Sequence, residues 1–205
     1  DPDIISDDAF GTLAAIWVRA MEQAGDFAAS LQAVERVLPR LEALGYSQNL
    51  SIVRTLAANA LTHGRDYVLA EKQAMASLQQ AEQHDDALGA AWAKAVLMRV
   101  YDETFWQDRL EVERLGAEIA PVAEAEGDMH LAMTARYMIS TVCRTYGYRK
   151  RALAGADDIE TVANRHGNRR ARAFAIWTRG VIHCVDGDPE AAADVVRAGK
   201  ADSIP

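Results

Sequence analysis

Short turn motifs recur about every forty residues along this 205-residue chain, and this spacing constrains its fold more than any other feature. Four turns centre on glycine, with 39 residues between Gly25 and Gly64 and 40 between Gly147 and Gly187. The 83 residues between Gly64 and Gly147 make two periods, so we expect one further turn, without glycine, near Asp102 to Thr104.

A second series of turns falls between the first, at Gly45, Asp85-Asp86, Gly127-Asp128 and Gly167-Asn168. Two interleaved series at one period are typical of helix–turn–helix units that stack as a solenoid. Strand-like alternation is nowhere sustained, and the abundant alanine favours helix. The sequence therefore predicts an all-α, right-handed α-solenoid of about five antiparallel helix pairs.

We expect residues 1–205 to form a single repeat domain that belongs to a longer protein. The chain opens without methionine and stops just after a helix pair, which favours a fragment. The predicted repeats span approximately residues 7–44, 48–84, 87–126, 129–166 and 169–198.

Local signals support the helix boundaries. Asp66, Asp128 and Asp188 precede apolar helical patterns, where a carboxylate can cap the first turn. Gly45 and Gly167 suit the left-handed position that ends a helix. A capping box is expected at Thr104-Phe105-Trp106-Gln107. Two prolines, Pro39 and Pro121, each lie six residues before a glycine and are expected inside helices that they bend.

Composition excludes several classes of protein. The 22 basic and 30 acidic residues give a net charge of −8, which disfavours a nucleic-acid partner for the surface as a whole. The two cysteines, Cys143 and Cys184, make no disulfide framework and fit a reducing, cytoplasmic location. No apolar run approaches the roughly 18 residues that a membrane span needs. We expect no membrane contact, no metal and no cofactor.

The helix pairs also resemble tetratricopeptide repeats. The matching stretches are Leu56-Ala57, Gly64-Arg65-Asp66-Tyr67 and Ala70 in one repeat, and Arg179-Gly180, Gly187-Asp188-Pro189 and Ala192 in another. The usual period of that family is about 34 residues, whereas the period here is nearer 40 because each helix is longer. The chain is similar to the extended arrays of bacterial signalling proteins, including large LuxR-type transcription regulators and the sensor halves of nucleotide cyclases and diguanylate cyclases.

This resemblance implies a binding function, with the first helix of each pair lining a concave face. Aromatic and arginine side chains at such a face suit a peptide, since they combine large buried area with bidentate contacts to carboxylates. Repeat position selects Arg54, Trp92, Tyr137 and Trp177, ten residues before their turns, and Arg99 and Arg144, three residues before theirs. Arg136 and Arg179 complete the candidate contact set. The alternative for Trp92 and Trp177 is that they only pack between helices.

Other modes of binding stay open at this point. Residues 136–179 hold ten basic and three acidic residues, a segment that could contact nucleic acid. The last repeat, Arg169 to Ala198, could pair two copies of the chain, because no following helix covers its apolar Ala175-Ile176-Trp177 and Val181-Ile182. A small-molecule effector is a further kind of partner.

The sequence does not predict an enzyme. None of the five histidines belongs to a metal-binding motif, and no nucleophile or phosphate-binding motif is present. Acidic pairs such as Asp7-Asp8 and Asp157-Asp158 fall at helix starts or turns, where capping explains them better than acid–base chemistry. We therefore expect recognition of a protein or peptide without catalysis, in a larger signalling or transcription-regulatory protein.

Overall fold

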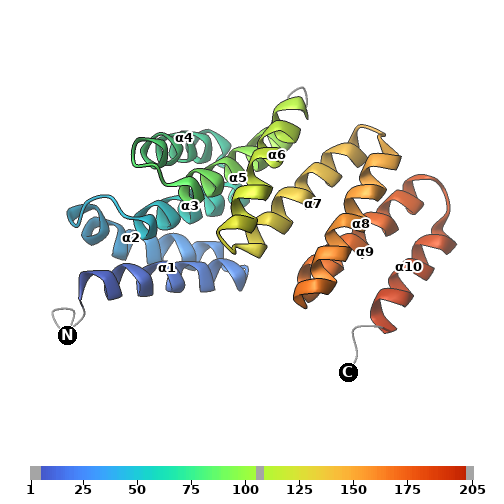
Figure 1. Cartoon of the computed structure of the whole chain (residues 1–205), viewed down its shortest axis with the longest axis horizontal. Helices are drawn as coiled ribbons and strands as arrows, with labels where there is room; N and C mark the ends of the chain where they lie inside the picture. Colours follow the sequence, from blue (N-terminus) through green and yellow to red (C-terminus); the bar gives the residue numbers. More distant parts are fainter. Residues whose placement is uncertain (1–5, 105–108, 202–205) are drawn as a thin grey trace. The chain divides into compact units, whose positions relative to one another are not determined.

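The computed structural model describes residues 6–104 and 109–201, which form ten α-helices and no strand (Figure 1). The first five are α1 (Asp7–Gln23), α2 (Phe27–Ala43), α3 (Gln48–His63), α4 (Tyr67–Gln83) and α5 (Ala87–Thr104). The other five are α6 (Arg109–Ala125), α7 (Met129–Thr145), α8 (Arg149–His166), α9 (Arg169–Val185) and α10 (Pro189–Ala201). The predicted all-α solenoid of helix pairs is confirmed.

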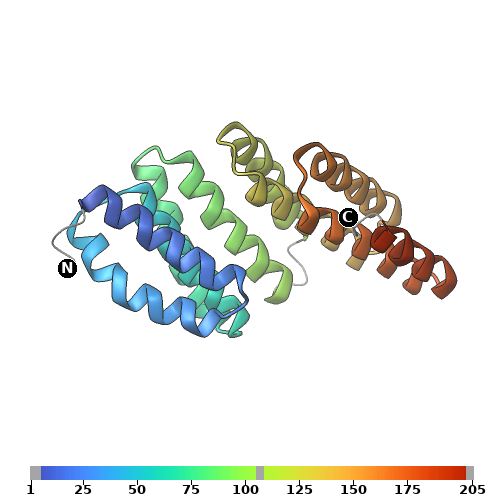
Figure 2. The ribbon, with the colours of Figure 1, turned by 90° about the horizontal axis from the view of Figure 1, so that it is seen from below.

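The chain divides into two compact units, residues 1–106 and residues 107–205. In unit 1 each helix packs on its neighbour in sequence, and α3 also packs on α1 and on α5. In unit 2 the helices from α6 to α10 pack in sequence order, and α7 also packs on α9. Successive helices run side by side in opposite directions in both units (Figure 2).

First helices therefore form the inner layer of each unit. Within the described residues, α1, α3 and α5 contact one another in series, as do α7 and α9, whereas α2 does not contact α4 and α8 does not contact α10. Helices that touch across a repeat lie on the inner side of a curved stack, while the outer helices diverge. This is the layer on which the expected contact residues were placed.

Small and aliphatic side chains fill the space between the layers. One core cluster in unit 1 joins Val18 of α1, Leu41 of α2 and Leu56 of α3, each no more than 1% exposed. A cluster in unit 2 joins Cys143, Ala152 and Ile182 from three successive helices. Each cluster crosses a repeat boundary, so neighbouring pairs stabilise one another.

The predicted helix caps are confirmed. Asp66, Asp128 and Asp188 each accept a hydrogen bond from the backbone N–H three residues later, at 2.9–3.2 Å. Gly45 and Gly167 both adopt positive φ. Pro39 and Pro121 both lie inside helices, as expected. The expected capping box at 104–107 falls mostly on residues outside the described ranges.

The predicted second turn forms between His63 and Tyr67, although glycine does not take its left-handed position, and the expected third turn needs correction. At the second turn Gly64 has a φ of −75°, and the following residue, Arg65, takes the left-handed conformation with a φ of 62°. Near the third turn, Asp102 to Thr104 are still helical and belong to α5. The positive-φ positions are 25, 45, 65 and 85 in unit 1 and 127, 147, 167 and 187 in unit 2, a spacing of twenty residues. The repeat thus fixes the position of each left-handed turn residue. Glycine is at most of these positions, and Arg65 and Asp85 are at the other two.

Candidate functional site

Four side chains on α7 and α9 form a continuous patch on the inner layer of unit 2, which we call the aromatic face: Tyr137, Arg144, Phe174 and Trp177. The Tyr137 ring stacks on Phe174, with 4.5 Å between centroids, and lies 6.2 Å from the Trp177 ring. The guanidinium of Arg144 lies over Trp177, 5.1 Å from the ring centroid. Trp177 remains 47% exposed, which is unusual for so large an apolar side chain.

Helical spacing explains why these residues meet. Tyr137 and Arg144 are seven residues apart on α7, and Phe174 and Trp177 are three apart on α9, so each pair shares one helix face. The direct packing of α7 on α9 then brings the two faces together. Three of the eight predicted contact residues, Tyr137, Arg144 and Trp177, are brought together here. Sequence reasoning missed Phe174, although its spacing from Trp177 could have indicated it.

The other two candidates in unit 2 are held in ion pairs with outer helices. Arg136 pairs with Glu124 of α6 at 2.6 Å. Arg179 pairs with Asp157 at 2.6 Å and with Glu160 at 2.5 Å, both on α8. Because Arg179 is only two residues from Trp177, it lies about 200° around the helix from the aromatic face. Arg136 thus links α7 to α6, and Arg179 links α9 to α8.

The three candidates in unit 1 do not form an exposed ladder. Arg54 pairs with Glu42 at 2.7 Å and also contacts Gln80. Trp92 is only 8% exposed, and its ring is covered by Arg19 of α1, 5.0 Å from the centroid. This arrangement corresponds to the packing alternative for Trp92, whereas Trp177 remains exposed.

The third of them, Arg99, contacts Nε2 of His63, whose ring stacks on Phe27 with 3.6 Å between centroids. A guanidinium can only donate, so Nε2 must be the unprotonated acceptor. Burial against its neighbours, together with the positive charge of Arg99, lowers the pKa of His63 from 6.5 to about 4. His63 is therefore neutral in the folded chain near neutral pH.

This contact predicts a pH dependence of stability. Because the folded pKa is lowered, the unfolded chain binds the proton more readily, and stability falls as pH drops from about 6.5 towards 4. Since the ring is partly solvated, we expect a loss of only about 0.5–1 kcal/mol between pH 7 and pH 5. Urea unfolding at both pH values should show that loss in the native chain. His63→Gln should reduce the difference, and an equal loss in the variant would contradict the assignment.

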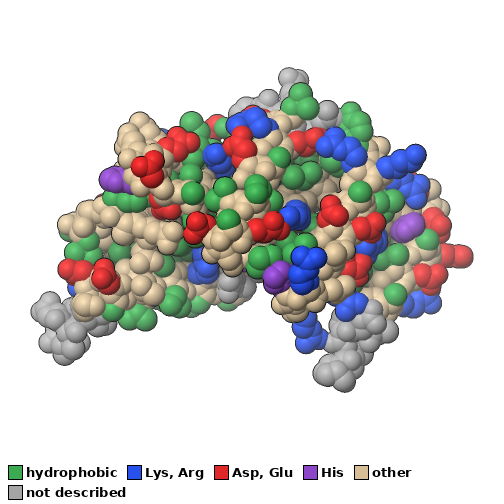
Figure 3. Space-filling model, viewed as in Figure 1, with side chains coloured by type: hydrophobic (Ala, Val, Ile, Leu, Met, Phe, Trp, Pro, Cys, Tyr) green, Lys and Arg blue, Asp and Glu red, His purple; other side chains and the backbone are tan. Residues whose placement is uncertain are grey.

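The basic segment at 136–179 is largely matched by acidic side chains. Arg149 pairs with Asp186 at 2.8 Å and Arg151 with Glu113 at 2.8 Å, in addition to the pairs of Arg136 and Arg179. Basic and acidic side chains alternate over α8 to α10 on the visible face (Figure 3). These pairs leave less unbalanced positive charge for a phosphate backbone than the sequence alone suggests.

The apolar stretch proposed as a pairing surface is partly covered in the folded chain. Ala175 and Ile182 are no more than 3% exposed, and Ile176 and Val181 are half-buried. Exposed valines remain on the last pair, with Val185 at 77% and Val196 at 41%.

The described residues 6–104 and 109–201 contain no group of three or more His, Cys, Asp or Glu side chains that could hold a metal ion. No described helix is long and apolar enough to cross a membrane. Cys143 is buried and Cys184 is exposed, and neither forms a disulfide within the described residues.

Structural comparison gives the fold. Two crystal structures of a kinesin light chain from Podosopora anserina, described as having nearly identical tetratricopeptide-like repeats, match almost the whole chain. One has a TM-score of 0.63 at 10% identity over 93% of this chain and 92% of the other. The second has a TM-score of 0.62 at 11% identity over 94% and 95%. The chain has a tetratricopeptide-like fold.

No family model and no curated protein matches the tetratricopeptide-like chain. At such low identity the solved structures show the fold alone. Folds of this kind generally serve as non-catalytic scaffolds that bind proteins, through the extended surfaces of their stacked helices.

Proposed function

We propose that this tetratricopeptide-like chain binds an acidic peptide segment of a protein partner on the aromatic face of unit 2. The observation that carries the proposal is the exposed Trp177 with Arg144 stacked on its ring. Tryptophan and arginine are the side chains that most often dominate binding energy at interfaces. A flat aromatic surface suits an apolar side chain, and a guanidinium beside it suits a carboxylate.

The distribution of charge supports an acidic partner. Helices α7 and α9 together contain six arginines and no aspartate or glutamate, whereas the acids of unit 2 lie on the outer helices and in the turns. The Nε of Arg144 is also buried without a hydrogen-bond acceptor among the described residues. Because an unsatisfied buried donor costs free energy, an arriving carboxylate that bonds this guanidinium is favoured.

The biological setting is part of the same proposal. The resemblance to the extended arrays of LuxR-type regulators and cyclase sensors supports a segment of a larger bacterial signalling or transcription-regulatory protein in the cytoplasm. Peptide binding there would bias an attached output domain through the packing of α7 on α9.

The test is selection from a displayed random-peptide library, followed by fluorescence anisotropy with the selected peptides. We expect acidic sequences with one large apolar residue, and an affinity that falls with added salt. Trp177→Ala and Arg144→Met should each weaken binding about 30-fold or more, the size typical of a central interface residue. Trp17→Ala is the matched control, because Trp17 is an exposed tryptophan of α1 in unit 1. Selection of neutral or basic peptides, or equal weakening by Trp17→Ala, would contradict the proposal.

Self-association through the last helix pair is the alternative, which the exposed Val185 and Val196 favour. Sedimentation equilibrium distinguishes the two, because a mass that stays monomeric at all protein concentrations excludes a dimer.

A further inference from the structure

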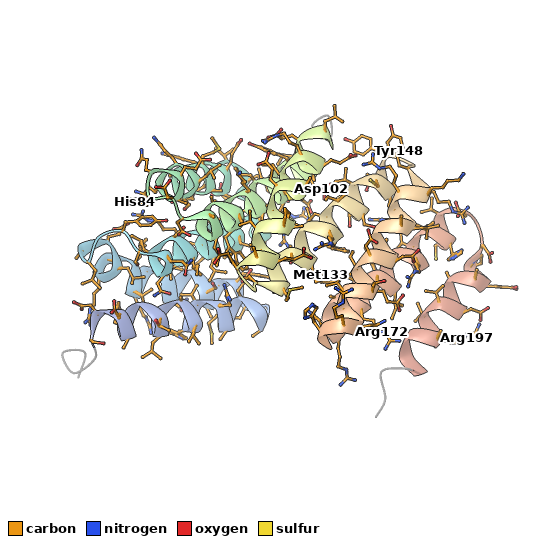
Figure 4. All side chains as sticks on the ribbon, viewed as in Figure 1. His84, Asp102, Met133, Tyr148, Arg172 and Arg197 are labelled. Atoms are coloured by element: carbon orange, nitrogen blue, oxygen red, sulfur yellow. The ribbon has the colours of Figure 1, made fainter. Side chains whose placement is uncertain are left out.

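An uncovered apolar surface lies on α1 in unit 1. Three large side chains of this helix are exposed: Leu13 at 52%, Ile16 at 58% and Trp17 at 39%. Ala9 and Ala20, also exposed, extend the same side of the helix by about one turn in each direction. We call these five residues the α1 stripe. Side chains of α1 project away from the other described helices of unit 1 (Figure 4), and in the view from below α1 lies in front of those helices (Figure 2).

Comparison between repeats shows that the α1 stripe is a helix-packing surface. Left-handed turn residues recur at 25 and 65 and at 45 and 85, so residues forty positions apart are equivalent in unit 1. The α3 residues equivalent to Leu13 and Ile16 are Val53 and Leu56, and each is 0% exposed. Val53 and Leu56 are buried in the core cluster that α3 shares with α1 and α2. The same positions of α1 have no preceding helix pair against them among the described residues.

The residue pattern of the α1 stripe fits a second copy of the same helix. Ala9, Leu13, Ile16 and Ala20 are separated by four, three and four residues, which is the spacing of a coiled-coil seam. The order small, large, large, small is the same in both directions along the helix. In an antiparallel pair, Leu13 therefore faces Ile16 of the second copy, and Ala9 faces Ala20. A twofold interface uses the same patch on both copies and needs this self-complementarity.

The charges around the α1 stripe also permit a second copy to approach. The segment Ala9–Val18 contains no charged residue. At the two ends of α1, acidic side chains bond to their own chain. Asp7 pairs with Arg40 of α2 at 3.2 Å, and Glu22 accepts a hydrogen bond from Asn59 of α3. Two copies can thus meet along the stripe without burying like charges against each other.

We propose that the chain forms a weak antiparallel homodimer through the α1 stripe. Three large side chains from each copy are few beside the roughly 20–30 residues per side of a stable interface. Pairing is therefore reversible, with a dissociation constant on the order of 100 µM. This surface is separate from the proposed peptide site, because α1 belongs to unit 1 and the aromatic face to unit 2.

The experiment is sedimentation equilibrium of the full chain at concentrations from about 10 µM to about 1 mM. We expect the weight-average mass to rise from one chain towards two and no further, because a twofold contact is closed. Ile16→Glu places a charge in the middle of the stripe and should weaken pairing at least tenfold, roughly as for a central interface residue. Val68→Glu is the matched control, because Val68 is a valine of α4 that is 82% exposed. Val196→Glu should also have no effect, which separates this dimer from pairing through the last helix pair.

Cysteine cross-linking tests the orientation of the two helices. The exposed thiol of Cys184 is first removed by Cys184→Ser. Chains that carry Ala9→Cys and chains that carry Ala20→Cys should form a disulfide with each other under mild oxidation. Neither variant should cross-link with itself, because the two copies of position 9 lie eleven residues of helical rise apart, about 16 Å.

Three results would overturn the proposal. A mass of one chain at every concentration would assign the α1 stripe to another occupant, a further helix of the same polypeptide or a different protein. Association that Ile16→Glu does not weaken would place the contact elsewhere, and cross-linking of Ala9→Cys with itself would exclude the antiparallel pair. Circular dichroism establishes that each variant is folded. If Ile16→Glu does not fold, the loss of pairing in Trp17→Ala and the cross-linking pattern still decide the question.

The homodimer and the peptide site can be tested independently. Ile16→Glu should leave peptide affinity unchanged within about twofold, and Trp177→Ala should leave the dissociation constant of the dimer unchanged within the same limit. Failure of the α1 stripe can therefore be told apart from failure of the aromatic face.

Discussion

Leu56→Ala should destabilise the chain by about 3 kcal/mol, within the range of roughly 2–5 kcal/mol for deleting a fully buried leucine side chain. Leu56 is 0% exposed and belongs to the cluster that joins α1, α2 and α3. Truncation removes three heavy atoms from this cluster, and helices fixed by their own caps cannot collapse fully into the void. The free energy of unfolding from urea titration measures the loss.

Leu13→Ala is the control for this prediction. Leu13 is a leucine of α1 in the same unit, but its side chain is 52% exposed. We expect a change below about 1 kcal/mol, as for most surface substitutions. Because solenoid repeats depend on their nearest neighbours, hydrogen exchange in Leu56→Ala should increase from α1 to α4 and remain unchanged in unit 2. An equal effect of the two substitutions would show that the repeat interface is not the source of stability.

The fold could be predicted from sequence because it depends on local signals that recur. An aspartate or asparagine caps six of the described helices (α2, α4, α5, α7, α9 and α10), and a serine caps α1 and α3, a pattern that is visible in the sequence. Helix bounds follow from these caps and differ from the expected ones by only a few residues. The prediction fails where the residue that takes the left-handed conformation is not the glycine. Arg65, and not Gly64, has positive φ. Position in the repeat was the stronger signal there.

The candidate site was harder to predict because repeat position does not fix a side chain's partner. Counting back from the turns selected Tyr137 and Trp177, and in the folded chain their rings lie 6.2 Å apart on α7 and α9. The same count placed Trp92 at an equivalent position, yet Arg19 covers its ring. The equivalent positions differ in the side chains that other helices bring against them, and these can be far away in sequence, since Arg19 lies 73 positions before Trp92.

The surface charge around the arginines of residues 136–179 was also hard to predict from the sequence. A surplus of basic residues between 136 and 179 suggested a positive surface. In the folded chain, Arg151 meets Glu113 and Arg149 meets Asp186, acids that lie outside the segment. A sequence window counts charge along one chain segment, whereas electrostatic potential depends on neighbours in space. Arg144, stacked on Trp177, stands apart from these pairs and for that reason carries the proposed function.

Gly89→Ala should destabilise the chain by about 2 kcal/mol, although alanine is normally the better helix residue by roughly 1 kcal/mol. Gly89 lies in the first turn of α5, and an added Cβ would collide with the carboxylate of Asp86 and lie 2.5 Å from Oγ of Ser51. The Asp86 carboxylate caps the helix through the N–H of Gly89 at 2.8 Å and accepts the hydroxyl of Tyr46, also at 2.8 Å. Displacing it costs the cap, about 1 kcal/mol, and a hydrogen bond to a charged acceptor, about 2 kcal/mol.

Tyrosine titration provides a second measurement of the same change. Burial, together with the hydrogen bond to Asp86, raises the pKa of Tyr46 from 10.0 to about 12. In Gly89→Ala that pKa should fall towards its ordinary value, because the carboxylate no longer accepts the phenol proton, and ultraviolet absorbance should detect the shift.

Gly64→Ala is the control, since Gly64 has a helical φ of −75° and an added Cβ would meet only ordinary contacts. It should leave the stability and the Tyr46 pKa unchanged. If Gly89→Ala is as stable as the native chain and the Tyr46 pKa is unchanged, α3 and α5 can separate at Gly89 without cost. That result would contradict the prediction that the close approach of Gly89 to Ser51 and Asp86 contributes to stability.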